Sequence, residues 1–191
     1  MFWKGEITME NNNTERKETS RTYSKEIAAV IRKVFEDDEL KFDFEEDEKA
    51  AIFDVSFTLD GKPKDMDMRF IVLEDAFAVF AESDAICADP DNADEMRKIA
   101  EFITRINDAR SSFTSTLSYE DGRIRGSIFT DCEDSLPSEE IVRNCIRRSF
   151  GWIEDFGPGF LKVLYGGVSP KEAFDACVEN EEDDEEDDEE E

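Results

Sequence analysis

Carboxylates make up most of the side chains in this chain that could do chemistry. Asp and Glu number 51 against 23 Lys and Arg, and there is no histidine. Acid–base catalysis at neutral pH and most zinc sites rely on imidazole, so this composition argues against many enzyme classes. Two carboxylates at a fixed separation could hydrolyse a glycosidic bond, but the sequence distinguishes no such pair. We therefore predict no catalytic residues.

One acidic segment has the beginning of a calcium-binding loop. Asp89 and Asp91 occupy the first and third positions of an EF-hand pattern, but Ala93 replaces an oxygen ligand and Asp94 replaces the glycine of the turn. We interpret the segment as a helix start and predict no metal site. Weak association of divalent cations with the acidic C-terminus stays open. No phosphate-binding loop or dinucleotide fingerprint is present, so no cofactor is expected.

The cysteines are widely spaced and form no C-x-x-C pair, which favours free thiols in a reducing compartment. No histidine is available to activate one of them as a nucleophile. The sequence has no apolar run long enough to span a membrane and no secretion signal at its start, so we expect a cytoplasmic protein. The cysteines are Cys87, Cys132, Cys145 and Cys177.

Apolar periodicity predicts the elements that position these groups. A stripe with helical spacing, such as Ile27, Ile31 and Val34, indicates an amphipathic helix, and strict alternation from Ala51 to Leu59 indicates a half-buried strand. Asp121-Gly122 between alternating runs is typical of a hairpin turn. The predicted helices are 20–36, 89–110 and one from 137 that breaks at 157–159, and the predicted strands are 40–44, 51–59, 70–73, 77–81, 113–119 and 123–130.

The order of these elements predicts an α+β fold. Helices between sets of antiparallel strands, in the order α-β-β-β(-β)-α-β-β-α, favour two layers, with the helices packed on one face of the sheet. We expect a flexible lead at 1–19, one domain at 20–165, an accessory helix at 166–178 and a disordered acidic tail at 179–191. Met9 is an alternative natural start.

The net charge of −28 restricts the partners of this protein. A surface this acidic repels a phosphate backbone and an anionic membrane, so neither nucleic acid nor membrane is an expected partner. A basic protein or a cation is the expected charged partner. The alternative is that the charge only keeps the protein in solution.

Four apolar residues are candidates for a partner-binding surface. The apolar positions of helix 89–110 cover about half of its circumference, more than one sheet contact needs. Phe102 and Ile106 on this helix either pack at the edge of the core or meet a partner. Leu117 and Tyr119, at the end of the first strand of the hairpin, are the other two candidates.

The segment from Ile99 to Phe156 resembles the YbjN family of bacterial proteins, whose fold is similar to that of type III secretion chaperones. The resemblance is carried by Phe102 to Asn107, Tyr119 to Ile124 and the helix around Ile141 to Ile153. With the upstream elements it extends over about residues 20–165. It implies a two-layer α+β domain, frequently a homodimer, that binds other proteins or regulates them without enzymatic activity. The acidic tail does not map onto the chaperones.

These observations lead to three hypotheses about function. The first is a non-catalytic, chaperone-like or regulatory domain that binds a protein partner in the bacterial cytoplasm. The second is a regulator whose acidic tail engages a basic partner. The third, with the least support, is a metal-dependent enzyme built on carboxylates.

Overall fold

The computed structural model describes residues 22–109 and 113–187, with side chains described as far as Glu179. A helix and four strands are followed by a second helix, two further strands and two C-terminal helices. The elements are α1 (Lys25–Asp37), β1 (Asp43–Glu46), β2 (Ala51–Thr58), β3 (Asp65–Val72), β4 (Ala76–Cys87), α2 (Ala93–Ala109), β5 (Thr114–Leu117), β6 (Arg123–Asp131), α3 (Glu139–Tyr165) and α4 (Pro170–Asp187).

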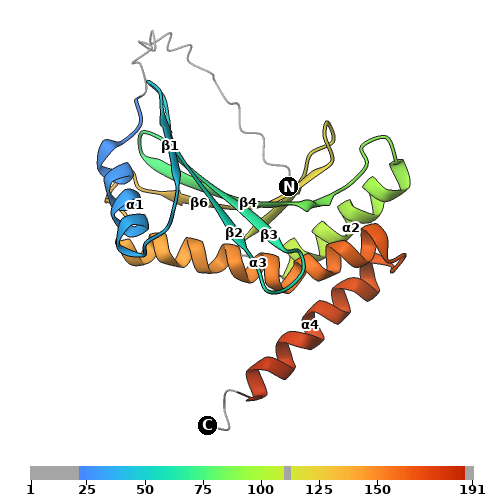
Figure 1. Ribbon diagram of the computed structural model, residues 1–191. Coiled ribbons are helices and arrows are strands. Elements are labelled where there is room, and N and C mark those ends of the chain that lie inside the picture. Colours follow the sequence, from blue (N-terminus) through green and yellow to red (C-terminus); the bar gives the residue numbers. More distant parts are fainter. Residues whose placement is uncertain (1–21, 110–112, 188–191) are drawn as a thin grey trace, which may run out of the picture.

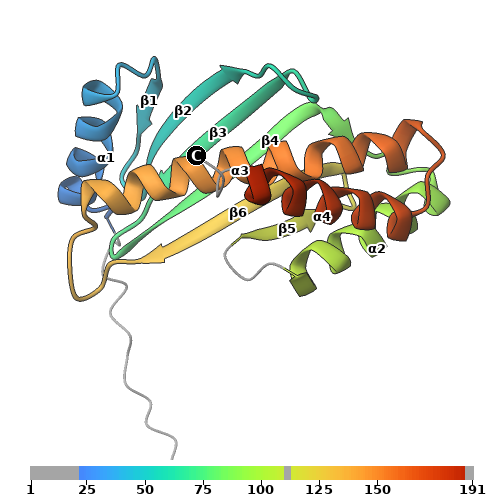
Figure 2. The ribbon, with the colours of Figure 1, turned by 90° about the horizontal axis from the view of Figure 1, so that it is seen from below.

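The strands form one antiparallel sheet in the order β1-β2-β3-β4-β6-β5. Figure 1 shows this sheet above α3, with α1 and α2 near its two ends. Seen from below, α3 crosses the sheet and α2 and α4 lie beside it (Figure 2). The predicted α+β fold, with two layers and the helices on one face, is confirmed.

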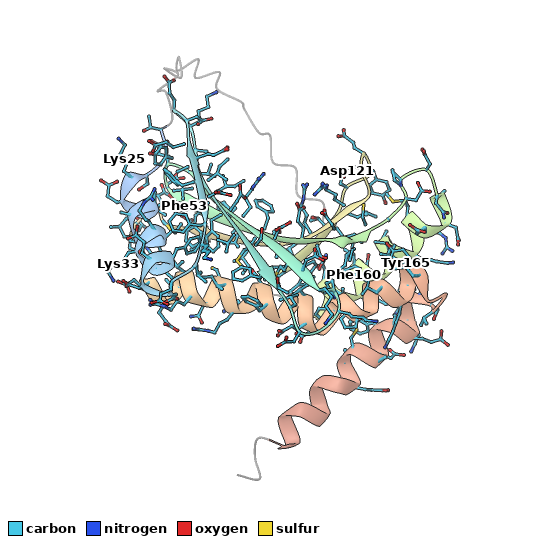
Figure 3. All side chains as sticks on the ribbon, viewed as in Figure 1. Lys25, Lys33, Phe53, Asp121, Phe160 and Tyr165 are labelled. Atoms are coloured by element: carbon cyan, nitrogen blue, oxygen red, sulfur yellow. The ribbon has the colours of Figure 1, made fainter. Side chains whose placement is uncertain are left out.

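The core lies between this face of the sheet and the helices. Alternate residues of β2 and β3 point into it, as the period of two requires, and they meet the apolar stripe of α1. Phe35 of α1 packs edge-on against Phe53 and Phe70, with ring centroids 5.7 and 5.1 Å away. Figure 3 marks Phe53 near α1 and Phe160 on α3, toward opposite ends of this core.

Local signals in the sequence place several element ends. The hydroxyls of Ser24 and Ser138 accept hydrogen bonds from the backbone N–H groups of Ile27 and Ile141, which caps α1 and α3. Gly122 has a φ of +71°, a left-handed conformation that suits the predicted hairpin turn. The predicted hairpin is confirmed, with its strands at Thr114–Leu117 and Arg123–Asp131.

The predicted break at 157–159 is wrong, because α3 is one continuous helix of 27 residues that includes Pro158. Proline removes one backbone donor and weakens a helix, but the glycines on either side allow close packing here. A Cβ on Gly157 would lie 2.5 Å from Pro63, and one on Gly159 would lie 2.4 Å from Phe102. The close packing at these two glycines therefore outweighs the tendency of proline to end a helix.

The predicted boundary at 178/179 also differs from the structure. The backbone stays helical as far as Asp187, so residues 179–187 continue α4 where disorder was expected. Glutamate is a good helix former, which offsets the repulsion of like charges that motivated the prediction. The flexible lead predicted at 1–19 and the last residues of the tail, 188–191, lie outside the described residues.

Two glycines of α3 provide a test of this packing. Gly159→Ala should lower the free energy of unfolding by about 1–3 kcal/mol, since the added methyl collides with Phe102 and Cys177. Gly151→Ala, where the nearest atom is 3.9 Å away, should raise it by about 0.5–1 kcal/mol through helix propensity alone. Urea unfolding of both variants measures this. Equal effects at the two positions would contradict the close approach of α3 to α2 and α4.

Candidate functional site

The face of the sheet opposite the helices has no packing partner in the described part of the chain. All the helices described lie on the other face (Figures 1 and 2). Successive side chains of a strand point to opposite faces, so every strand also sends residues to this uncovered side. We call this side the open face.

The register of the strands aligns four apolar residues across the open face. Ile52 lies opposite Ile71, Ile71 opposite Ala78, and Ala78 opposite Phe129. Because directly opposed residues share a face, the four form one line across β2, β3, β4 and β6, which we call the apolar row. Phe129 is 67% exposed, which is unusual for a large aromatic side chain within a strand.

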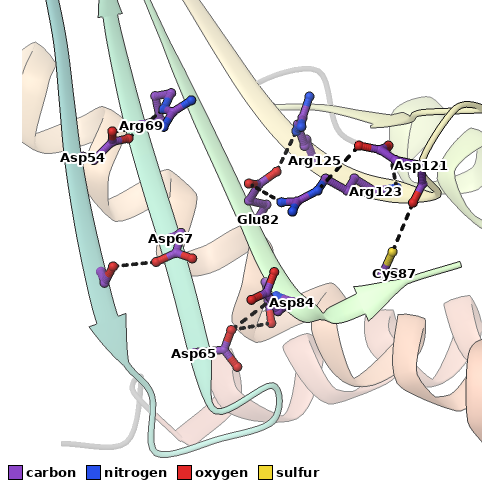
Figure 4. A network of polar contacts seen from close by, with 12 residues as sticks. Asp54, Asp65, Asp67, Arg69, Glu82, Asp84, Cys87, Asp121, Arg123 and Arg125 are labelled. Carbon is purple, nitrogen blue, oxygen red and sulfur yellow. Dashed lines mark hydrogen bonds and ion pairs between the residues drawn. The ribbon is translucent and has the colours of Figure 1, made fainter. Parts of the chain in front are cut away.

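The next two rows of the open face are polar and cross-linked. Arg69 donates two hydrogen bonds to Asp54, with nitrogen–oxygen distances of 2.7 and 3.0 Å. Glu82 accepts from Arg123 at 2.9 Å and from Arg125 at 2.6 Å. Figure 4 shows these contacts bridging neighbouring strands. With Asp121, whose carboxylate lies 3.5 Å from Arg123, these carboxylates balance the three arginines of this part of the face.

Several carboxylates on the described part of the open face form no such ion pair. Ser56 donates a hydrogen bond to Asp67 at 2.6 Å. Asp67 forms no ion pair among the described residues, and the same holds for Asp43 and Glu45 of the edge strand β1. The hydrogen bond from Arg69 to Asp54 raises the pKa of that guanidinium, so Arg69 stays charged and paired. The open face therefore carries a local excess of negative charge.

A shallow cavity of about 340 Å³ lies within the polar rows. Its wall includes the ring of Phe80 and the side chain of Ile71 beside the carboxylates of Asp67 and Glu82. The remaining lining residues are Asp54, Val55, Ser56, Met68, Arg69 and Arg125. Apolar surface and carboxylate oxygens are thus accessible from the same depression.

Two of the predicted partner-binding residues are in the core, which corrects that prediction. Phe102 and Ile106 are 0% exposed, and the Phe102 ring packs edge-on against Phe160 at 4.8 Å. The wide apolar arc of α2 is explained by contacts with α3, α4 and β5, so it needs no external partner. The alternative that Phe102 is a core residue holds.

The other two predicted residues lie at the hairpin. Leu117 is half-buried against the core, while Tyr119 is 72% exposed beyond the end of β5. The structure does not join them to Phe102 and Ile106 in one accessible surface. Whether Tyr119 meets a partner stays a prediction.

The apolar row was missed because its residues come from four separate strands. One signal in the sequence could have revealed it. Ile124 and Ile128 lie on the buried side of β6. Phe129 lies on the opposite side, together with Ser127 and Arg125. A phenylalanine out of phase with the buried residues of its strand indicates exposed apolar surface.

The thiols offer no activated nucleophile. Burial raises the pKa of Cys87, Cys132, Cys145 and Cys177, so each is a neutral thiol at pH 7. Among the described residues, no three His, Cys, Asp or Glu side chains are grouped to hold a metal ion. None of the helices in the same ranges has the length and apolar character needed to cross a membrane.

The chain matches no model of a known protein family and no curated protein. The resemblance to the YbjN family therefore stays a prediction. We infer function from the open face itself.

The corrected role of Phe102 can be measured directly. Phe102→Ala should lower the free energy of unfolding by about 3–5 kcal/mol, because it leaves a cavity between α2 and α3. Tyr119→Ala should change it by less than about 0.5 kcal/mol, since that ring is exposed. Denaturant unfolding of the two variants decides the point. A Phe102 variant as stable as the parent chain would place this side chain outside the core.

Proposed function

We propose that this chain is a non-catalytic, chaperone-like domain of the bacterial cytoplasm that binds other proteins through its open face. The observation that supports this most is the apolar row with its exposed Phe129 on an otherwise polar surface. Burial of a phenylalanine side chain that is otherwise exposed contributes about 1.5–3 kcal/mol, enough to make it an anchor for a partner.

The polar rows suit a binding surface better than a catalytic site. Their arginines are paired across strands, so the surface is charged, ordered and already satisfied before a partner arrives. Charges arranged around an apolar centre favour selectivity and rapid encounter over raw affinity. The open face thus combines apolar and charged residues side by side, as protein interfaces do.

Two further features support parts of the proposal. All four cysteines are free, which is usual in a reducing compartment. The α+β fold agrees with what the resemblance to YbjN proteins implies. The homodimer implied by that resemblance stays a prediction.

Suppression of client aggregation tests the proposed function. Lysozyme exposes apolar segments and aggregates when its disulfides are reduced, and the present chain has no disulfide to lose under those conditions. The full chain should slow this aggregation, and Phe129→Ser should remove at least about half of the effect because it deletes the main apolar anchor. Light scattering over time provides the measurement.

Tyr165→Ser is the matched control. Tyr165 is 70% exposed but ends α3, on the helical side of the molecule. This variant should protect lysozyme as well as the parent chain does, and both variants should unfold at nearly the parental urea concentration. Equal protection by the parent and Phe129→Ser chains would exclude the open face as the binding surface.

A further inference from the structure

We propose that the partner on the open face is a basic, amphipathic polypeptide segment. Its apolar side would lie on the apolar row, and its lysines or arginines would face the carboxylates of the adjoining polar rows. This inference rests on the proposed function and adds to it the chemistry of the partner.

The apolar row sets the length of the contact. Its four residues lie on four neighbouring strands, which span about 14 Å at the usual spacing of about 4.8 Å between strands. Phe80, two residues after Ala78 on β4, extends the apolar surface into the next row. A segment that crosses the strands with two or three apolar side chains on one side fits this row.

The polar rows select the charge of that segment. Asp54, Glu82 and Asp121 hold the three arginines of the face in ion pairs, so no unpaired guanidinium is left there to attract an anionic partner. Asp43 and Asp67 form no ion pair among the described residues, and Glu45 interacts with Arg69 only beyond ion-pair distance. A cationic side chain beside Asp67 gains a favourable interaction, whereas a carboxylate in the same place is repelled.

The cavity in the polar rows has the shape and chemistry for such a side chain. The methylene groups of a lysine or arginine can contact Ile71 and the Phe80 ring, while the charged end reaches Asp67. The aromatic ring also attracts a cation placed above its face. The apolar wall and the carboxylate of Asp67 thus contact the two halves of one long basic side chain.

A second copy of this chain is a poorer occupant. Two open faces in contact would bring the uncompensated carboxylates of both copies together, and like charges facing each other oppose association. The net charge of −28 on each chain adds to this repulsion. Charge complementarity therefore favours a basic partner.

Three synthetic peptides of about 14 residues, or about 21 Å as a helix, test the proposal on the full chain. The first repeats Leu and Lys in an amphipathic pattern, the second replaces Lys by Glu, and the third replaces Leu by Ser. Fluorescence anisotropy at about 0.15 M salt measures their dissociation constants. Only the Leu/Lys peptide should bind tightly, and the other two should bind at least about 10-fold more weakly.

Two substitutions and their matched controls locate the site. Phe129→Ser should weaken binding of the Leu/Lys peptide about 10-fold, and Tyr165→Ser less than about 2-fold. Asp67→Lys should weaken it at least about 5-fold. Glu140→Lys changes the net charge equally, at an exposed position of α3, and should again have less than about a 2-fold effect.

Each contrary result has a distinct meaning. If Phe129→Ser weakens binding but Asp67→Lys acts no differently from Glu140→Lys, the open face binds proteins but does not select basic ones, and only this inference fails. If Phe129→Ser has no effect, the peptide binds away from the open face, and the proposed function fails too. Equal affinity for the Ser/Lys peptide overturns the apolar contact. A dimer in sedimentation that Phe129→Ser dissociates makes a second copy the occupant and overturns the basic partner.

Discussion

The packing of α3 across one face of the sheet is the constraint on which the rest of the structure depends. Its contact with β6 is close, because a Cβ on Gly126 would lie 1.8 Å from Phe113 and 2.7 Å from Trp152. The Trp152 ring stacks on Phe113, and its N–H donates to Ser115 at 2.9 Å. The hairpin and α3 are thereby fixed together, and the apolar residues of every strand are buried on the same side of the sheet.

Because the described helices all pack on one face of the sheet, the open face is stabilised by other means. Cross-strand ion pairs, such as that between Asp54 and Arg69, contribute modestly at an exposed surface. They do, however, make a sheet face compatible with water where no helix covers it. The apolar row interrupts this polar pattern. Its residues face away from the core, so packing of the domain does not explain why they are apolar. The binding role proposed above supplies that reason, and the proposed basic partner matches Asp43 and Asp67, which form no ion pair among the described residues.

Local pattern predicts much of this fold and little of its surface. The alternation in β2, the stripe of α1 and the Asp121-Gly122 turn are each encoded within a few residues, so these elements could be predicted from sequence. The passage of α3 through Pro158 depends on Phe102, more than fifty positions away in the chain, and no local rule contains it. The apolar row likewise exists only once the register of four strands is set. The sequence left Phe102 open between the core and a partner surface for the same reason, since the residues that pack against α2 lie outside its own periodicity.

Photo-crosslinking from the open face tests the central claim most directly. A photoreactive phenylalanine derivative in place of Phe129, in the full chain, would be irradiated in the presence of reduced lysozyme, with the same derivative in place of Tyr165 for comparison. The account predicts a covalent adduct with the client from position 129 and little or none from position 165, because only the open face contacts the client. Equal adducts from both positions, or none from position 129, would contradict it.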